Sequence, residues 1–334
     1  MNDERKGIRK KSGMPPVCGV GYTSALECRG VCAYSGGMKV LVTGSSGLIG
    51  GALITRLTGA GHYVVRLVRG TPDRSRGDVV WDPVTGHIER SQLKGIEGVV
   101  HLAGENILGL WTKSKKERIH KSRVVATEYL AEALAGMVVR PEVMISASAV
   151  GFYGDRGDEW LPEHAPAGRG FLPQLCREWE DASAIARNAG IRVVHPRIGI
   201  VLTPRGGALG QMLGPFKMGL GGPIGRGRQY MSWITLDDLL DAFLFMLENP
   251  ELSGPVNAVS PDPVTNRDFT KTLARTLHRP AFLPVPSFLL NALPGGMARE
   301  TLLASARVQP AKLQRAGFTY QHSDLESALT HLVG

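Results

Sequence analysis

Three glycines at regular spacing are the first residues in this sequence whose type and order indicate chemistry. Val40–Gly50 reads VLVTGSSGLIG, with Gly44, Gly47 and Gly50 between a β-branched run and a segment of helical periodicity. Glycines permit a tight turn and a close backbone approach to a ligand, and the free N–H groups at the start of the next helix bind anions. The pattern predicts a pyrophosphate site for a dinucleotide rather than a merely tight turn.

The end of the second predicted strand bears on which dinucleotide is bound. Residues 62–70, HYVVRLVRG, read as a buried strand that ends at Val68 and Arg69. At this place an acidic residue would accept the ribose 2′-hydroxyl of NAD, whereas an arginine can pair with a 2′-phosphate. We therefore expect NADP (NADPH) to be preferred, with NAD as the second option. The alternative is that Arg69 is only a solvated strand end.

The elements that must position these residues alternate along the chain. Strand-like runs are separated by helical stretches, and they read KVLVTG, HYVVRLVRG, GVVHLAG, EVMISASA and IRVVHPRIGIVL. Such alternation predicts parallel βαβ units, hence an α/β fold with a Rossmann-type doubly wound parallel sheet. After about residue 203 the chain is rich in glycine and apolar residues, as expected of loops and short helices over a cleft. We expect residues 38–203, with later strands included where needed, to bind the nucleotide, and residues 204–334 to form a smaller substrate lobe with C-terminal helices.

Composition narrows the class of protein. The chain has 334 residues and a formal charge of +9, and six basic against three acidic residues place +3 of that charge in residues 1–37. We expect that segment to be a disordered extension or a misassigned translation start. The remaining charge is spread out, which argues against nucleic acid as a partner, and no apolar run is long enough to span a membrane.

Cysteine usage indicates a reducing compartment. Three of the four cysteines lie in residues 1–37 and only Cys176 lies in the body of the chain, so no disulfide framework supports the fold. Cys28 and Cys32 have no partner His or Cys pair, and we expect no metal site. The sequence favours a cytoplasmic protein with a small-molecule substrate, and a homodimer is compatible with it.

Several motifs together resemble a known family. TGxxGxxG, HLAG and a serine-containing fifth strand followed by FYGD resemble the extended short-chain dehydrogenase/reductases of the NAD-dependent epimerase/dehydratase type. Downstream, PRIGIVL, PFKMGLGGPIGRGRQYMSWI and VQPAKLQRAGFTY resemble its atypical subgroup with a C-terminal domain of unknown function. The resemblance covers Met38 to the end. It implies a Rossmann fold with bound NADP or NAD and leaves the substrate undefined.

The resemblance also implies a set of cofactor-binding residues. Around the pyrophosphate it places Gly44, Ser46, Gly47, Leu48, Ile49 and Gly50. At the adenosine and its ribose it places Val68, Arg69, Leu102, Ala103 and Gly104, with Arg123 near the cofactor and Val201 at its nicotinamide end.

The catalytic residues of the wider superfamily match only in part. There a Ser polarises the substrate oxygen, a Tyr transfers its proton, and a Lys four residues later lowers the tyrosine pKa. Ser148 suits the serine, but Leu172 and Cys176 stand at the Tyr and Lys positions if Glu180 marks the register. Tyr153 is our candidate proton donor, the alternative being a packing aromatic. Cys176 as a nucleophile and the neighbouring Glu178 as an acid or base are weaker candidates.

A glycine-rich loop is the candidate substrate lid. Anion-binding and stacking groups occur in Gly219–Trp233, namely Arg226, Arg228, Gln229 and Trp233. Arg197 precedes the apolar run IGIVL and is expected to face the ligand cleft or a buried partner. We predict an NADP(H)-dependent oxidoreductase or epimerase acting on a small polar substrate. The alternative is a catalytically silent NADP(H)-binding sensor, and some members of the family carry a cell division inhibitor label.

Overall fold

A parallel sheet forms the centre of the fold. The computed structural model describes residues 37–286 and 295–334, so the prediction for residues 1–37 lies almost wholly outside it. The sheet has the order β13-β9-β6-β5-β1-β2-β3-β4, with β7 also on β9, and all pairs are parallel except β3–β4. Its strands are β1 (Lys39–Thr43), β2 (Tyr63–Val68), β3 (Val79–Asp82), β4 (His87–Ile88), β5 (Gly98–His101), β6 (Val143–Ser146), β7 (Ser148–Ala149), β9 (Arg192–Ile198) and β13 (Gly254–Ala258).

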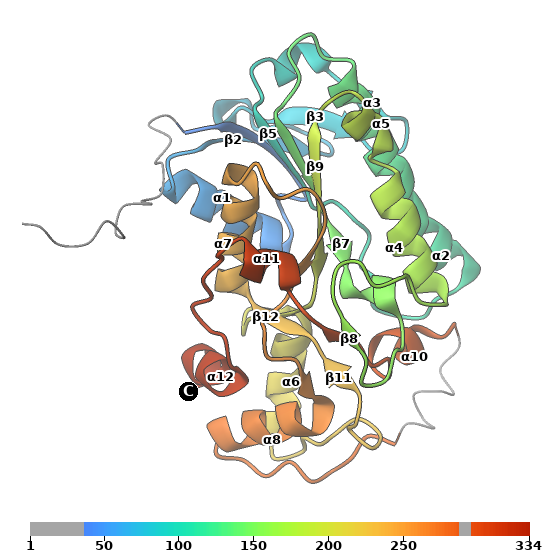
Figure 1. The fold of residues 1–334 in the computed structure, drawn as a ribbon, viewed down its shortest axis with the longest axis vertical. Helices are drawn as coiled ribbons and strands as arrows, with labels where there is room; N and C mark the ends of the chain where they lie inside the picture. The colour runs from blue at the N-terminus through green and yellow to red at the C-terminus, as the bar shows by residue number, and fades with distance from the viewer. Residues whose placement is uncertain (1–36, 287–294) are drawn as a thin grey trace, which may run out of the picture. The chain divides into compact units, whose positions relative to one another are not determined.

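Helices cover both faces of this sheet (Figure 1). On one face, α1 (Leu48–Gly59) and α7 (Leu236–Glu248) pack Leu53, Leu57 and Phe243 against Val40 and Val100 of the strands. On the other, α3 (Ala126–Ala135) and α5 (Ala184–Asn188) cover the strands with Leu130 and Ala186.

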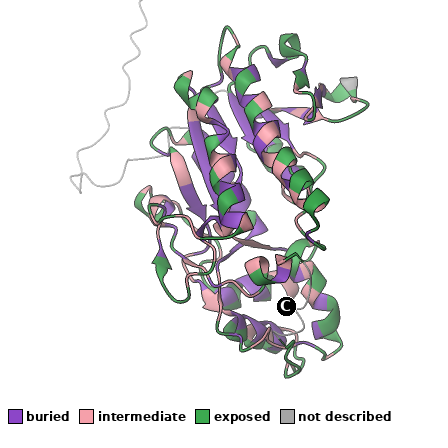
Figure 2. Cartoon of the chain, turned by 90° about the vertical axis from the view of Figure 1, so that its right-hand side faces the viewer, coloured by how far each residue is buried: buried purple, intermediate pink, exposed green. Residues whose placement is uncertain are grey.

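Every residue of β5 and β6 is buried, as Figure 2 shows for the central strands. Parallel strands covered on both faces read as continuous apolar runs, which is why these segments were recognisable as strands. The predicted doubly wound sheet is confirmed.

The helical path from β5 to β6 changes its winding in the middle. α2 (Lys113–His120) continues into a single π-helical turn, η3 (Lys121–Val125), and then into α3. The path from β7 to β9 includes α4 (Phe171–Asp181). Short 3₁₀ segments are η1 (Arg74–Arg76), η2 (Arg90–Leu93) and η4 (Val150–Tyr153).

The smaller lobe is assembled from segments far apart in the chain. Three two-stranded pairs contribute to it: β10 (Ile200–Leu202) with β12 (Trp233–Thr235), β11 (Tyr230–Met231) with β14 (Val264–Thr265), and β8 (Trp160–Leu161) with β15 (Arg307–Val308). Its helices are α6 (Gly207–Lys217), α8 (Asn266–Thr276), α10 (Met297–Thr301) and α12 (Leu325–Val333), whereas α11 (Ala311–Arg315) packs Leu313 into the core of the main sheet beside β13. Because β8 precedes residue 203 and β13 of the main sheet follows it, the two lobes exchange segments across that position. Within the described ranges, no helix has the length and apolarity that a bilayer crossing requires.

Candidate cofactor and substrate site

The glycine turn is shaped to hold an anion against the start of α1. Gly44 has φ +68°, and a Cβ there would lie 2.8 Å from the Leu102 carbonyl carbon, while a Cβ on Gly50 would collide with the Gly44 oxygen. Gly47 forms the N-cap of α1 without any side-chain hydrogen bond, and the first turn has no acidic residue. The first N–H groups of the helix are thus free for a ligand, and its positive dipole end is not neutralised. These residues fit a pyrophosphate.

Beside this turn, the residues that follow β5 are hydrogen-bonded to Thr43 at the end of β1. The N–H groups of Leu102 and Ala103 donate to Thr43 Oγ1 at 3.0 and 3.1 Å. The buried His101 ring joins Thr43 Oγ1 to Thr127 Oγ1 through contacts of 2.8 and 3.0 Å. Burial lowers the pKa of His101 to about 4, so the ring is neutral near pH 7 and serves the fold rather than proton transfer.

This histidine predicts an acid sensitivity of folding. Since its pKa is about 4 in the folded chain and near 6.5 when unfolded, the unfolded state binds more protons between these values. Stability is therefore expected to fall by up to about 3 kcal/mol as pH drops from 7 to 4. Urea unfolding across this pH range measures how the free energy of unfolding changes with pH, with His101→Gln as the comparison. A slope that is the same in both proteins contradicts the assignment.

Arg123 reaches the same edge through the π turn. Its Nη1 donates to the Glu105 carbonyl oxygen at 2.9 Å, and its guanidinium lies 5.1 Å from the Trp179 ring centroid. A Cβ on Gly104 would come within 3.1 Å of its Cζ, so the glycine admits the guanidinium. The extra residue of a π turn re-aims side chains, and here it directs Arg123 inward. Burial lowers the pKa of this guanidinium.

Arg69 is exposed just beyond β2, the strand next to β1. No carboxylate in the described part of the chain lies within 4.0 Å of it, whereas Arg66 of the same strand is paired with Asp78 at 2.6 Å. Val68 before it is half-buried. Arg69 is therefore the cation of this strand end that is available to a ligand.

The remaining cofactor candidates surround the turn. Ser46 and Leu48 are exposed, and Ile49 packs partly into the core. Gly206 and Gly207, at the start of α6, lie against the Leu48 side chain, and Val201 is half-buried in β10 just before them. The structure thus brings the nucleotide candidates to the carboxyl edge of the sheet.

Ser148 is joined to a buried ion pair. Its Oγ donates to Glu180 Oε1 at 2.7 Å, and Arg197 donates to both oxygens of Glu180 at 2.8 Å each. Arg197 is 3% exposed, and it also donates to the Glu163 carbonyl oxygen at 3.0 Å. Burial lowers the pKa of Arg197, but the hydrogen bond and charge of Glu180 raise it above its ordinary value. Of the two alternatives for Arg197, the ligand cleft and a buried partner, the structure has the second, so its assignment to substrate binding is corrected.

Tyr153 does not reach a cleft. The side chain is fully buried, its hydroxyl donates to Asn257 Oδ1 at 2.7 Å, and Arg197 Nη1 donates to it at 3.0 Å. Burial raises the pKa of the phenol, which makes it a weaker acid. The proposed proton donor is thus corrected to the packing aromatic. A phenol engaged on both sides has no free position for a substrate.

The positions where the superfamily has Tyr and Lys are filled by apolar packing. Leu172 and Cys176 are 8% and 2% exposed. Burial raises the pKa of the Cys176 thiol to about 12, so it carries no nucleophilic thiolate near pH 7. Glu178 lies on the surface and its Oε2 accepts a contact of 2.9 Å from His120 Nε2. Neither Cys176 nor Glu178 is a catalytic candidate in this arrangement.

The predicted lid residues separate into two groups. Arg226 and Arg228 are exposed on the loop before β11. Gln229 Nε2 donates to the Ile224 and Leu302 carbonyl oxygens. Trp233 is fully buried, and its Nε1 donates to the Asp262 carbonyl oxygen at 2.8 Å. Trp233 as a stacking residue is thus corrected to a core residue, and Gln229 closes the loop on itself.

Sequence reasoning missed the function of two acidic residues. Glu180 served only to set a register, yet it holds both Ser148 and Arg197. Glu163 is 5% exposed and accepts from the N–H groups of Asn257 and Lys312. The available signal was that Glu180 follows Cys176 by four residues and so lies on the same side of α4 as this buried residue.

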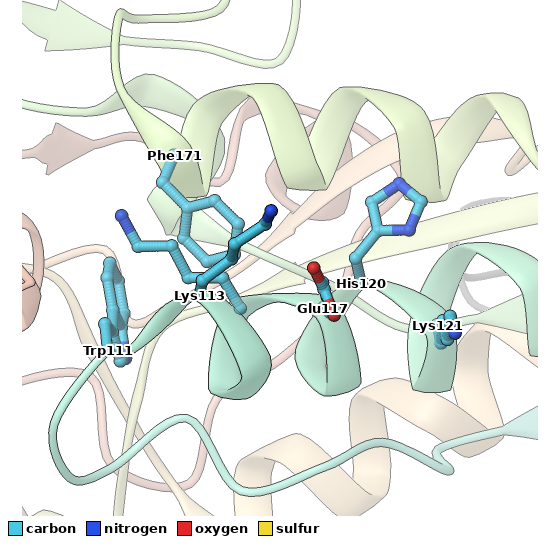
Figure 3. Close-up of a pocket in the computed structure, with 7 residues that line it drawn as sticks. Trp111, Lys113, Glu117, His120, Lys121 and Phe171 are labelled. Atoms are coloured by element: carbon cyan, nitrogen blue, oxygen red, sulfur yellow. The ribbon is translucent and has the colours of Figure 1, made fainter.

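A separate pocket of about 560 Å³ lies between α2 and α4 (Figure 3). Its lining contains none of the predicted site residues. The Lys116 ammonium lies 5.6 Å from the Trp111 ring centroid and 5.0 Å from that of Phe171.

Comparisons with known proteins agree with this architecture. Residues 40–259 match the model of the NAD dependent epimerase/dehydratase family, and residues 285–332 match a domain of unknown function, DUF1731. An epimerase family protein of Mycobacterium bovis is 44% identical over 291 residues, which cover 87% of this chain and 96% of that protein.

Two solved structures are also similar. The human epimerase family protein SDR39U1, crystallised with NADPH, has 33% identity and a TM-score of 0.81, covering 88% of this chain and 99% of that one. A nucleoside-diphosphate sugar epimerase from Corynebacterium glutamicum has 40% identity and a TM-score of 0.75; the match covers 89% of this chain but only 58% of that longer chain. With its glycine turn, sheet order and C-terminal segment, the chain belongs to the NAD dependent epimerase/dehydratase family and carries the DUF1731 domain at its C-terminal end.

Proposed function

We propose that this protein is an NADP(H)-dependent oxidoreductase or epimerase that acts on a small polar substrate. The observation that carries the proposal is the glycine cradle at the uncapped start of α1, with Arg69, which has no carboxylate partner among the described residues, at the end of the neighbouring strand. A bound nicotinamide cofactor supplies the hydride donor or acceptor. NADPH in the human relative supports this class of ligand. In our proposal Arg69 selects the 2′-phosphate, and Arg123 holds the cofactor from the opposite helix.

Ser148 and Glu180 replace the missing tyrosine and lysine in this proposal. Because Ser148 donates its own proton to Glu180, its oxygen presents lone pairs and suits a substrate hydroxyl group. As a substrate hydroxyl is converted to a carbonyl, its proton passes to Ser148 Oγ while the serine proton passes to Glu180. Carbonyl reduction runs the same relay in reverse. Arg197 keeps the carboxylate in place and is a positioning residue.

A catalytically silent NADP(H) sensor remains the second candidate. It is favoured by one observation, the burial of Leu172 and Cys176 where the superfamily has its Tyr and Lys. Tight NADPH binding without turnover of any alcohol or carbonyl compound supports the sensor. Turnover that is lost in Ser148→Ala, with NADPH affinity and thermal midpoint retained, supports the enzyme.

The experiment for the cofactor is a fluorescence titration of NADPH and NADH. Wild type is expected to bind NADPH more tightly, and Arg69→Ala is expected to lose about 10- to 100-fold in NADPH affinity, the worth of one or two charge-assisted hydrogen bonds. NADH affinity should change little. Arg177→Ala on α4 is the matched control, since Arg177 is also exposed and is distant in sequence from the turn. If Arg69→Ala keeps the wild-type preference for NADPH over NADH, Arg69 does not bind the 2′-phosphate.

A further inference from the structure

Arg307 of the C-terminal segment lies between two aromatic rings. It begins β15 and pairs in register with Trp160 of β8. Its guanidinium carbon is 3.9 Å from the Trp160 ring centroid and 4.6 Å from that of Tyr230 in β11. β8 and β11 lie near each other in Figure 1, and the Ala306 N–H donates to the Tyr230 carbonyl oxygen. Three segments far apart in the sequence thus combine to hold one cation.

Among the described residues, none accepts a hydrogen bond from the Arg307 guanidinium. Arg307 Nε is buried without a partner, and no carboxylate within residues 37–286 and 295–334 lies within 4.0 Å of the side chain. Two other arginines that lie over aromatic rings do have an acceptor: Arg197 is paired with Glu180, and Arg123 donates to the Glu105 carbonyl oxygen. A buried N–H without an acceptor costs free energy, so this arrangement calls for an acceptor that the described chain does not supply.

The two rings contact the guanidinium but do not accept hydrogen bonds from its N–H groups. With the Trp160 and Tyr230 rings packed against its carbon, the guanidinium meets a ligand through its N–H groups. A planar fork of donors matches the two oxygens of a carboxylate or phosphate. Trp160 is 46% exposed, so the site borders solvent. Arg226 and Arg228 are exposed on the loop that leads into β11, two to four residues before Tyr230.

We propose that Arg307, held between Trp160 and Tyr230, binds the carboxylate or phosphate group of a small-molecule ligand. Arg307 lies within the DUF1731 match, whereas Trp160 and Tyr230 lie within the match to the NAD dependent epimerase/dehydratase family, so the proposed site joins the two segments. It is independent of the cofactor proposal, because neither the glycine turn nor Arg69 takes part in it.

Trp160 provides the readout. Of the five tryptophans, Trp160 is 46% exposed, whereas the others are 7% exposed or less: Trp81, Trp111, Trp179 and Trp233. Acrylamide-quenchable emission of the full chain therefore reports on Trp160. Inorganic phosphate and acetate are titrated separately at constant ionic strength against chloride, with and without NADPH. A saturable change in quenching is expected with at least one oxyanion and not with chloride, and the tighter of the two identifies the ligand group.

Variants test whether Arg307 carries this binding. Arg307→Gln, which removes the charge, is expected to weaken oxyanion binding by roughly tenfold or more, and Arg307→Lys, which keeps the charge without the fork, by a smaller factor. Arg177→Ala should leave the titration unchanged. Arg307→Lys also serves if Arg307→Gln does not fold. The proposal is overturned if both oxyanions behave like chloride, or if folded Arg307→Lys and Arg307→Gln retain the wild-type midpoint. Loss of NADPH binding in Arg69→Ala with oxyanion binding intact separates the two proposals.

Discussion

Replacing Glu180 by Gln is expected to lower the free energy of unfolding by about 3–5 kcal/mol, because it leaves the buried Arg197 guanidinium without its counter-charge. The Arg197 side chain is 4% exposed and that of Glu180 is 11% exposed, so water does little to screen the lost charge. Glutamine has nearly the same shape but turns an N–H₂ group toward one of the Arg197 donors. Urea unfolding monitored by circular dichroism measures the change.

A neighbouring glutamate provides the control for this prediction. Glu178 lies two residues earlier on α4 and is paired with His120 on the surface. Glu178→Gln is expected to change stability by less than about 0.5 kcal/mol, since exposed pairs contribute little. Equal effects of the two variants would show that the Arg197–Glu180 pair is no more important than a surface pair.

The Glu180 relay is tested by catalysis rather than by stability. Ser148→Ala removes the bridging hydroxyl and leaves the Arg197–Glu180 pair intact. If Ser148 moves the substrate proton, kcat is expected to fall by roughly 10²- to 10⁴-fold with the thermal midpoint nearly unchanged. The assay requires a substrate found by screening alcohols and carbonyl compounds with the cofactor. A normal kcat in Ser148→Ala assigns proton transfer to another group.

Local patterns were sufficient to predict the main sheet. β5 and β6 are buried on both faces, and they appear in the sequence as unbroken apolar runs between helical stretches. The position of β13 and the pairing of β8 with β15 could not be predicted in the same way. These contacts join segments separated by long stretches of chain, and no short-range periodicity specifies a partner strand.

The candidate site also contains features set by neighbouring residues and features set by residues distant in the sequence. The geometry of the glycine turn depends on residues within a few positions of one another, and the structure has the tight turn and free helix start that the pattern predicts. Whether an arginine is paired with a carboxylate or available to a ligand depends instead on which residues the fold places beside it. Arg197 meets Glu180 and is neutralised, whereas Arg307 meets two rings and no carboxylate in the described chain. Residue type alone cannot distinguish these cases.

The same dependence explains the incorrect assignment of Tyr153. Its position after the strand that carries Ser148 favoured a place in the cleft. The structure turns the ring into the core because Asn257 and Arg197, both later in the sequence, satisfy its hydroxyl there. A buried phenol with both partners present loses little by leaving water.

Gly44→Ala is expected to weaken NADPH binding by about 100-fold or more and to destabilise the fold by about 1–3 kcal/mol. Two effects act together. At φ +68° an alanine is strained, and its Cβ would lie 2.8 Å from the Leu102 carbonyl carbon, which is backbone and cannot rotate away. Relief of this contact requires the turn to move away from β5, which displaces the N–H groups at the start of α1. NADPH titration and thermal unfolding measure the two effects separately.

Gly59→Ala provides the matched control on the same helix. Gly59 ends α1, and a Cβ there meets no atom within 4 Å. Because alanine restricts the unfolded chain and favours the helix, this variant is expected to be more stable by about 0.5–1 kcal/mol with unchanged NADPH affinity. The comparison separates a general effect of adding a methyl group to α1 from a specific effect at the phosphate turn. If Gly44→Ala binds NADPH as tightly as Gly59→Ala, the turn does not contact the pyrophosphate, and the cofactor must lie elsewhere on the sheet edge.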